Sequence, residues 1–176
     1  ALIQKILGGK PLPYVNGGIS NDPRLFAATE PLLRAMEEAF DELEEDDVLY
    51  DLAQALSAVG GQRHPRRLFD YHAAERAREY IHDAFDKTIT LDELAQVSGR
   101  DRWSLTRDFR ALFGTTPYRY VTMRRLEHCR RLMLAGDSLV DIAARTGFAD
   151  QSHMTRHFVK AFGISPGHWQ RMFTVP

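Results

Sequence analysis

The 176-residue chain lacks what several protein classes require. Its only cysteine is Cys129, so no internal disulfide can form, which favours a reducing cytoplasm over a secreted setting. No apolar run approaches the ~20 residues that a membrane helix needs, and no signal peptide is visible. We also find no glycine-rich phosphate loop and no spacing typical of a catalytic triad. We therefore expect a cytoplasmic protein that contacts no membrane, is not an enzyme and holds no cofactor.

Charge is divided unevenly along the chain. Residues 1–61 hold four Lys/Arg and eleven Asp/Glu, a balance of −7, whereas residues 62–176 hold nineteen and thirteen, a balance of +6. Because a cationic surface attracts polyanions, the second half is the candidate for nucleic-acid binding. The glycines, proline and charges that begin at Gly60 predict a linker at 62–70. This linker would separate an acidic helical pair, residues 1–61, from a basic domain, residues 71–176.

Within the acidic half, apolar residues recur at helical spacing in two stretches. Asp22-Pro23 starts the first by the cap-then-proline rule, and the second runs from Val48 to Val59. Pro31 is expected to kink or split the first helix. Its stripe consists of Leu25, Phe26, Thr29, Leu32, Leu33, Met36, Ala39, Phe40 and Leu43.

The first residues of the chain differ from these helices. A short apolar segment from Leu2 to Leu7 is followed by glycine and proline turns. This arrangement predicts the last strand of a domain that lies mostly upstream. Because the chain begins with Ala rather than Met, we expect a trimmed N-terminus.

One sequence pattern occurs twice between Thr90 and Arg171. The copies align at an offset of 48 residues as far as a shared glycine and at 49 residues after it. A repeat that keeps apolar anchors, a glycine turn and an arginine in register indicates a duplicated structural module. The matched pairs are Leu94/Ile142, Ala95/Ala143, Gly99/Gly147, Thr106/Thr155, Arg107/Arg156, Phe109/Phe158, Phe113/Phe162, Gly114/Gly163 and Pro117/Pro166.

Each copy predicts a helix, a tight turn and a second helix. Thr90 to Glu93 form a capping-box pattern, and Gly99 ends the short helix that follows. Two helices joined through a glycine turn form a helix-turn-helix, whose second helix enters the DNA major groove. We predict units at about 91–113 and 139–162. A connecting helix at about 117–135, roughly 28 Å long, would place both recognition helices on one face of DNA.

With these motifs the chain resembles the AraC/XylS family of bacterial transcription regulators over about residues 70–171. The residues that carry the resemblance are Leu94-Ala95, Ser98-Gly99, Leu105 to Phe109, Phe113-Gly114, Pro117, Arg125-Leu126, Asp141 to Ala143, Gly147-Phe148 and Phe158 to Pro166.

The resemblance implies an all-α fold, a seven-helix double helix-turn-helix domain preceded by a two- or three-helix segment. Residues 22–61 resemble the helical tail of the family's cupin-like effector barrel. The implied function is sequence-specific regulation of transcription, more often activation. The implied partners are double-stranded DNA, RNA polymerase, and a small-molecule effector bound only through a missing N-terminal domain.

The apolar stripes predict which side chains of the recognition helices face DNA. Arginine suits guanine, glutamine suits adenine, and threonine and tryptophan suit phosphate, sugar or a thymine methyl. In the family, the positions that match Trp103, Thr106 and Arg107 contact DNA. The predicted contacts are Arg102, Trp103, Thr106, Arg107 and Arg110 in the first helix and Gln151, Ser152, His153, Arg156 and Lys160 in the second.

Other interpretations of some of these residues remain open. Arg107 and Arg156 could each brace a module through an ion pair, and Trp103 could belong to the core. His153 and His157 are four residues apart and could share a metal. However, no Asp, Glu or Cys accompanies them at suggestive spacing, so we expect no metal site.

Two alternative functions also remain. Cys129 could be the nucleophile of a DNA alkyl-transfer repair protein, although it lies on the apolar stripe of the connecting helix. Alternatively, residues 22–61 could be the functional part, forming a homodimer or docking on a barrel, with the basic domain only as an anchor.

Overall fold

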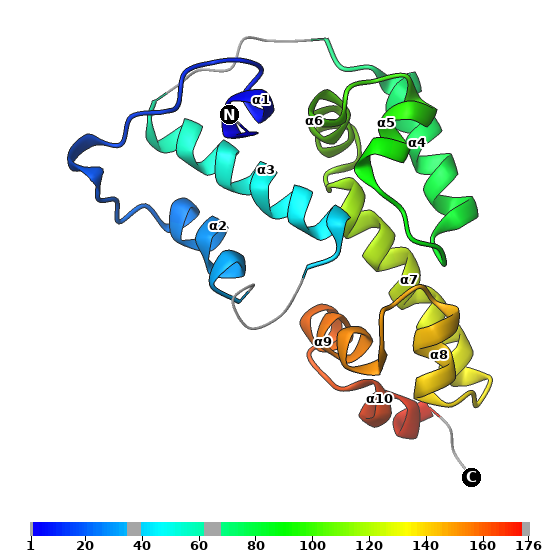
Figure 1. Ribbon diagram of the computed structural model, residues 1–176. Helices are drawn as coiled ribbons and strands as arrows, with labels where there is room; N and C mark the ends of the chain where they lie inside the picture. The colour runs from blue at the N-terminus through cyan, green and yellow to red at the C-terminus, as the bar shows by residue number, and fades with distance from the viewer. Residues whose placement is uncertain (1, 35–39, 62–67, 174–176) are drawn as a thin grey trace.

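The computed structural model describes residues 2–34, 40–61 and 68–173, and these residues form helices and loops without a strand. The predicted all-α fold is therefore confirmed. None of the described helices combines the length and apolar character that a bilayer-spanning segment needs. In chain order they are α1 (Leu2–Ile6), the 3-10 turn η1 (Asn16–Gly18), α2 (Pro23–Arg34), α3 (Glu42–Val59), α4 (Tyr71–Ala84), α5 (Leu91–Ser98), α6 (Arg102–Phe113), α7 (Pro117–Leu134), α8 (Leu139–Arg145), α9 (Gln151–Phe162) and α10 (Pro166–Phe173) (Figure 1).

The two helix-turn-helix units, α5–α6 and α8–α9, use matching local signals. Asp101 and Asp150 occupy equivalent positions, and each side chain caps its recognition helix by accepting a backbone N–H three residues ahead. Both recognition helices end at a glycine with left-handed backbone, Gly114 and Gly163. The first unit also has the predicted capping box at Thr90 and Glu93. The repeat in the sequence is thus a repeat in local structure.

Helix α7 connects the two units and takes part in two separate cores (Figure 1). Its N-terminal half contributes Val121 to the core of the first unit, together with Leu94 and Phe109. Its C-terminal half contributes Leu126, Cys129 and Met133 to the core of the second unit. A single rigid helix therefore sets the separation of the two recognition helices.

The N-terminal segment differs from expectation in several places. Residues 2–6 form the short helix α1 and not a strand, because Ile6 and Leu7 bury their side chains in the core of the first unit. Helix α2 continues through Pro31 and ends at Arg34. The predicted stripe positions Met36 and Ala39, like residues 62–67 of the predicted linker, lie outside the described residues.

Helix α3 begins at Glu42, six residues before the predicted start. The Asp41 side chain caps it by accepting the backbone N–H of Glu44 at 2.7 Å. Carboxylates in the first turn, including Glu42 and Glu45, also interact favourably with the positive end of the helix dipole. The acidic residues that precede the predicted start at Val48 therefore help to start the helix.

The packing of α3 joins the acidic half to the basic half. Tyr50 and Ala53 of α3 belong to the same buried cluster as Trp103 and Phe109 of α6. The N-terminal helices and the first helix-turn-helix unit therefore share a core, and α3 lies along that unit (Figure 1).

The position of the first core relative to α8–α9 depends on Arg125 and Gly147. Arg125 is buried on α7 and donates hydrogen bonds to the carbonyls of Phe85 at 2.8 Å and Lys87 at 2.9 Å. Gly147 lies against this arrangement with a φ of +78°. A Cβ there would approach the Asp86 carbonyl oxygen to 2.8 Å and Arg125 Nε to 3.0 Å.

We predict that Gly147→Ala is clearly more destabilising than Gly114→Ala. Both glycines have positive φ, which costs an L-residue roughly 1–2 kcal/mol, but the space around the Gly114 Cβ position is open. The overlap at Gly147 should add about 1–3 kcal/mol. Denaturant unfolding measures both variants, and equal losses of unfolding free energy would show that the close approach at Gly147 is not rigid.

Candidate nucleic-acid interface

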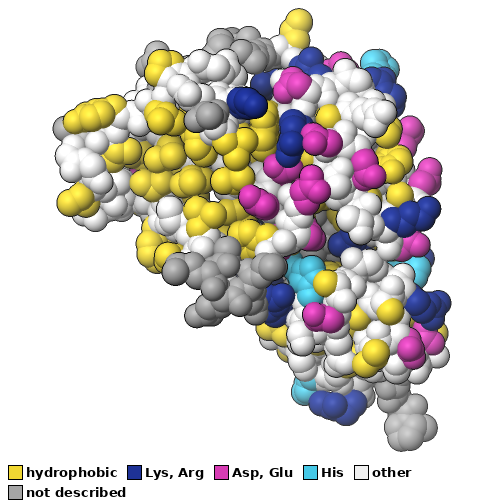
Figure 2. All heavy atoms as spheres, in the orientation of Figure 1, with side chains coloured by type: hydrophobic (Ala, Val, Ile, Leu, Met, Phe, Trp, Pro, Cys, Tyr) yellow, Lys and Arg dark blue, Asp and Glu magenta, His cyan; other side chains and the backbone are white. Residues whose placement is uncertain are grey.

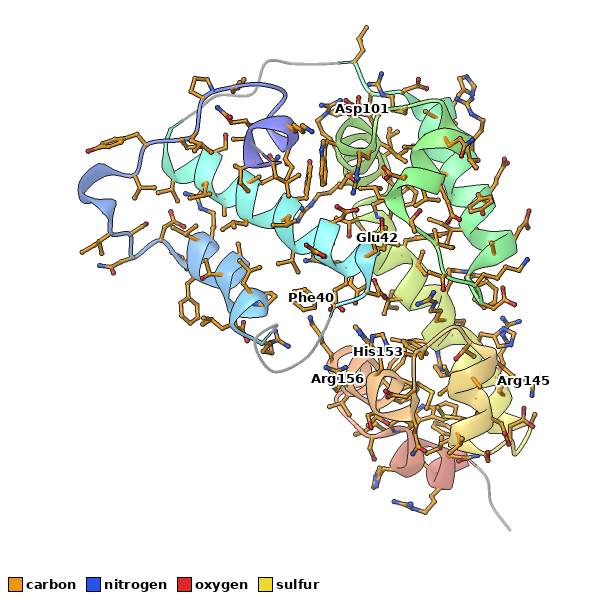
Figure 3. The ribbon with its side chains drawn as sticks, viewed as in Figure 1. Phe40, Glu42, Asp101, Arg145, His153 and Arg156 are labelled. Atoms are coloured by element: carbon orange, nitrogen blue, oxygen red, sulfur yellow. The ribbon has the colours of Figure 1, made fainter. Side chains whose placement is uncertain are left out.

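The second recognition helix, α9, presents a polar and basic face. Ser152, Arg156 and Lys160 are exposed and follow one another at four-residue spacing, so they share one side of the helix. Gln151 is exposed at the start of the helix, whereas Met154 and Phe158 are buried. Figure 3 places His153 and Arg156 on the side of α9 that faces the start of α3. Of the contacts predicted on this helix, Gln151, Ser152, Arg156 and Lys160 are therefore exposed, whereas His153 is partly buried.

The first recognition helix, α6, is covered by α3. Arg102 pairs with Asp46, and its Nη1 also lies 3.1 Å from Asp92. Arg110 pairs with Asp51 of α3. Figure 2 shows acidic and basic side chains meeting along this boundary. Two of the predicted DNA contacts are therefore occupied by carboxylates of the same chain.

Arg119, at the start of α7, joins the same contact. Its Nη2 lies 2.7 Å from Asp51 Oδ2, and its Nε lies 3.4 Å from Asp47 Oδ2. Burial raises the pKa of Asp47 and of Asp46 despite these cations. Arg119, Asp46, Asp47 and Asp51 were not among the predicted site residues, although the opposite net charges of the two halves were a signal of such pairing.

Trp103 and Thr106 do not face outward as we expected. The exposed fraction of Trp103 is 9% and that of Thr106 is 2%. The Trp103 ring packs in the cluster that contains Ile6 and Tyr50, and the Thr106 hydroxyl donates to the Arg102 carbonyl at 2.9 Å. The expectation failed because the apolar faces of α1 and α3 close over this side of α6.

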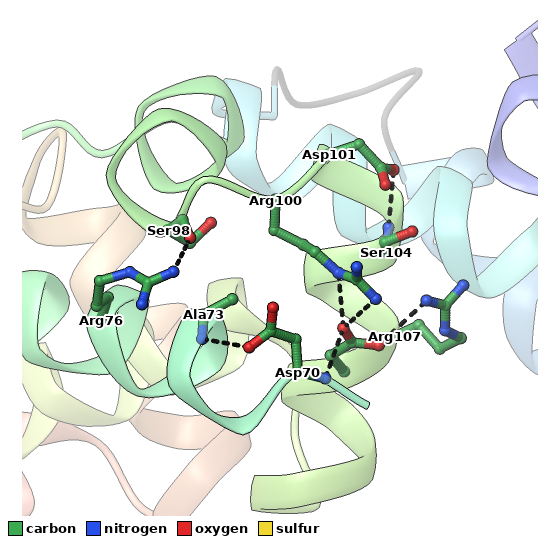
Figure 4. A network of polar contacts seen from close by, with 9 residues as sticks. Asp70, Ala73, Arg76, Ser98, Arg100, Asp101, Ser104 and Arg107 are labelled. Atoms are coloured by element: carbon green, nitrogen blue, oxygen red, sulfur yellow. Dashed lines mark hydrogen bonds and ion pairs between the residues drawn. The ribbon is translucent and has the colours of Figure 1, made fainter. Parts of the chain in front are cut away.

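Arg107 is held within its own unit. The carboxylate of Asp108 is fully buried and pairs with Arg107 at 3.1 Å and with Arg100 at 2.9 Å (Figure 4). It also accepts the Asp70 backbone N–H at 3.3 Å. The structure therefore contains the bracing ion pair that we considered as an alternative for Arg107. A side chain braced in this way is oriented before it meets a ligand.

Cys129 is unsuited to nucleophilic chemistry. It is fully buried, and its thiol lies 3.3 Å from the Thr146 hydroxyl. Burial raises the pKa of the Cys129 thiol to about 11, so at neutral pH the reactive thiolate is scarce. These observations disfavour the alkyl-transfer alternative.

We predict that Cys129 of the folded chain resists a water-soluble thiol reagent such as DTNB, because the reagent cannot reach a fully buried sulfur. The unfolded chain should release one equivalent of thionitrobenzoate, since the sequence has one cysteine. Absorbance with and without denaturant makes the comparison. Rapid, complete labelling of the folded chain would contradict the buried position.

Two histidines of α9 and one carboxylate of α3 form a group that could hold a metal. Within the described residues, Glu44 of α3 lies with His153 and His157 so that one ligand atom of each is within 4.8 Å of the others. We expected no acid to accompany these histidines. The sequence spacing gave no sign of Glu44, because it comes from about 110 residues earlier in the chain and meets the histidines only in the fold.

Comparisons with known proteins agree with this geometry. A model described as a helix-turn-helix domain matches residues 94–172. The probable transcription factor PqrA of Proteus vulgaris is 37% identical over 89 residues, which cover 50% of this chain and 73% of PqrA. The transcriptional activator NphR of Rhodococcus sp is 37% identical over 52% of this chain and 26% of NphR.

Among solved structures, the C-terminal domain of AraT, a response regulator from Geobacillus stearothermophilus, is similar to this chain. The TM-score is 0.56 at 27% identity, and the match covers 59% of this chain and 88% of that one. The chain spans only 28% of the length of one Bacillus subtilis relative and 26% of NphR.

Proposed function

Because the chain belongs to the AraC/XylS family of DNA-binding transcription regulators, we propose that it binds two adjacent major-groove segments of one site through α6 and α9. We further propose that it activates transcription in the cytoplasm and has no catalytic role. The relative NphR is named a transcriptional activator, which supports activation over repression.

The observation that carries the proposal is the equivalence of the two units around Arg107 and Arg156. Both arginines lie six residues after the aspartate that caps their helix, on helices of equal length joined by helix α7. Arginine can donate two hydrogen bonds to guanine O6 and N7. The backbone N–H groups at the start of each helix suit phosphate oxygens. We assign base contacts to Arg107, Gln151 and Arg156, and phosphate contacts to Ser152 and Lys160.

In this proposal the arrangement of α3 is a resting state. The carboxylates of Asp46 and Asp51 occupy the guanidinium groups of Arg102, Arg110 and Arg119, which would otherwise meet phosphates. Partly exposed ion pairs contribute only about 0.2–1 kcal/mol each. DNA contacts of the same groups can therefore replace them. Full engagement of α6 requires α3 to move away.

We predict that Arg156→Ala weakens binding to a specific DNA site by about 1–3 kcal/mol, because one two-bond base contact is lost. Arg107→Ala should have an effect of the same size. Thermal unfolding of the Arg156 variant should match the parent protein, since Arg156 is exposed. Fluorescence anisotropy with a site selected from random DNA provides the affinity.

The matched control is Arg24→Ala, which removes an exposed arginine near the start of α2. Its affinity should change little. The affinity of the parent protein should also fall steeply with added salt, as expected when several cations displace counterions from DNA. Unchanged affinity in both recognition-helix variants, or a flat salt response, would contradict DNA contact through these helices.

We predict that the double variant Asp46→Asn/Asp51→Asn binds the same DNA about tenfold more tightly. It removes three ion pairs to Arg102, Arg110 and Arg119, worth roughly 1.5 kcal/mol together. The control is Glu42→Gln/Glu45→Gln, which removes two exposed charges from the same helix. If both double variants tighten binding equally, general charge repulsion and not the contact with α6 would be responsible.

We also propose that residues 22–61 associate with a second copy of the chain. RNA polymerase and a small-molecule effector are further proposed partners. Phe26 and Leu33 of α2 are 71% and 64% exposed, and Figure 2 shows apolar side chains gathered on this face. Phe26→Ser should reduce self-association in sedimentation experiments. A parent chain that stays monomeric at high concentration would contradict the dimer.

A further inference from the structure

Glu44, His153 and His157 form a compact cluster between the acidic helix and the second recognition helix. Glu44 lies in the first turn of α3, and the histidines lie four residues apart on one side of α9. All three residues are partly buried, and their ligand atoms lie within 4.8 Å of one another. The helix-turn-helix architecture does not by itself require any of these side chains to meet.

The set of donor atoms suits a divalent transition metal. Two imidazole nitrogens and one carboxylate oxygen are typical zinc ligands and leave a fourth tetrahedral position for water. Ligand atoms around zinc lie roughly 3.4 Å apart, given bond lengths of about 2.0–2.1 Å. Small rotations of the side chains would therefore bring the three groups to coordinating distance.

Burial of the two histidines favours their neutral form. Burial lowers the pKa of His153, and burial together with the neighbouring His153 lowers the pKa of His157 to about 3. Neutral imidazole is the ligating form. Burial raises the pKa of Glu44, which also has Tyr118 and Lys160 nearby. A cation between the three groups would offset the cost of burying this carboxylate.

Neighbouring aromatic groups orient the two imidazole rings. The Phe148 ring stacks on His157 at a centroid distance of 5.9 Å and meets His153 edge-on at 5.4 Å. The Tyr118 hydroxyl lies 3.4 Å from His157 Nε2, where it can accept an N–H and leave Nδ1 for the metal. The Ala149 N–H donates to His153 Nδ1 at 3.4 Å, a long hydrogen bond that a metal at this nitrogen would replace.

We propose that Glu44, His153 and His157 bind one divalent transition-metal ion, with zinc as the best match, and that the ion fixes α3 against α9. The site requires α3 and α9 to be together. A metal bound there therefore stabilises the arrangement in which α3 also covers α6. The next step rests on the proposed DNA-binding function. Metal and DNA favour different positions of α3, so each lowers the affinity of the chain for the other by the same factor.

The direct test is a calorimetric titration of the metal-free chain with zinc chloride alone. We expect about one equivalent to bind, and Glu44→Gln and His157→Gln each to weaken binding by more than about tenfold. The control His168→Gln alters an exposed histidine of α10 and should bind as the parent does. Absence of zinc binding, or equal affinity in all three variants, would overturn the proposal.

A second measurement does not depend on the variants folding. The chain has seven histidines, and NMR of the parent protein reports each imidazole ring separately. Zinc should shift the ring signals of His153 and His157 and leave His72 and His168, both exposed, in place. Shifts confined to other histidines would overturn the site.

The link to DNA is tested separately. Zinc should weaken DNA binding by the parent protein and have no such effect on Glu44→Gln. If zinc binds at the cluster but DNA affinity is unchanged, the proposed antagonism is wrong and the metal site stands. If the metal-free chain binds no DNA at all, the proposed function fails, and the zinc titration still decides the site.

Discussion

The arrangement of this chain depends on the pairing between the carboxylates of α3 and the guanidinium groups of the first helix-turn-helix unit. Asp46 and Asp51 meet Arg102, Arg110 and Arg119 at the edge of an apolar contact between Tyr50 and Trp103. Each ion pair is weak because it is partly exposed. Together with the apolar contact they hold α3 on α6. The same interaction uses part of the opposite charge of the two halves of the chain, and it distinguishes α6, whose arginines are paired with α3, from α9.

The helices and turns of the basic half could be predicted from the sequence, because their signals are local or repeated. Capping residues such as Thr90, glycines such as Gly99, and apolar stripes at helical spacing act within a few residues. The offset between the two copies then relates one unit to the other without knowledge of any long-range contact. For the same reason the polar face of α9, with Arg156, was predictable from the buried positions of Met154 and Phe158.

Features that depend on contacts between distant segments could not be predicted in the same way. The outward positions expected for Trp103 and Thr106 follow from the helical period of α6, which contains no information about a covering helix. Likewise, the carboxylate that lies beside His153 and His157 is far from them in the sequence. Glu44 joins them only because the first turn of α3 lies beside these residues of α9. The opposite net charges of the two halves indicated that they attract each other, but they did not indicate which residues pair.

The central claim is that α3 lies on α6 in the absence of DNA and leaves it when both recognition helices bind. Spin labels at Glu45 of α3 and Ala111 of α6, both exposed, would report this distance by pulsed electron paramagnetic resonance. Cys129 is buried and should remain unlabelled. We expect one short, narrow distance distribution for the free chain and a longer, broader one on a specific DNA site. The same short distance with and without bound DNA would contradict the account.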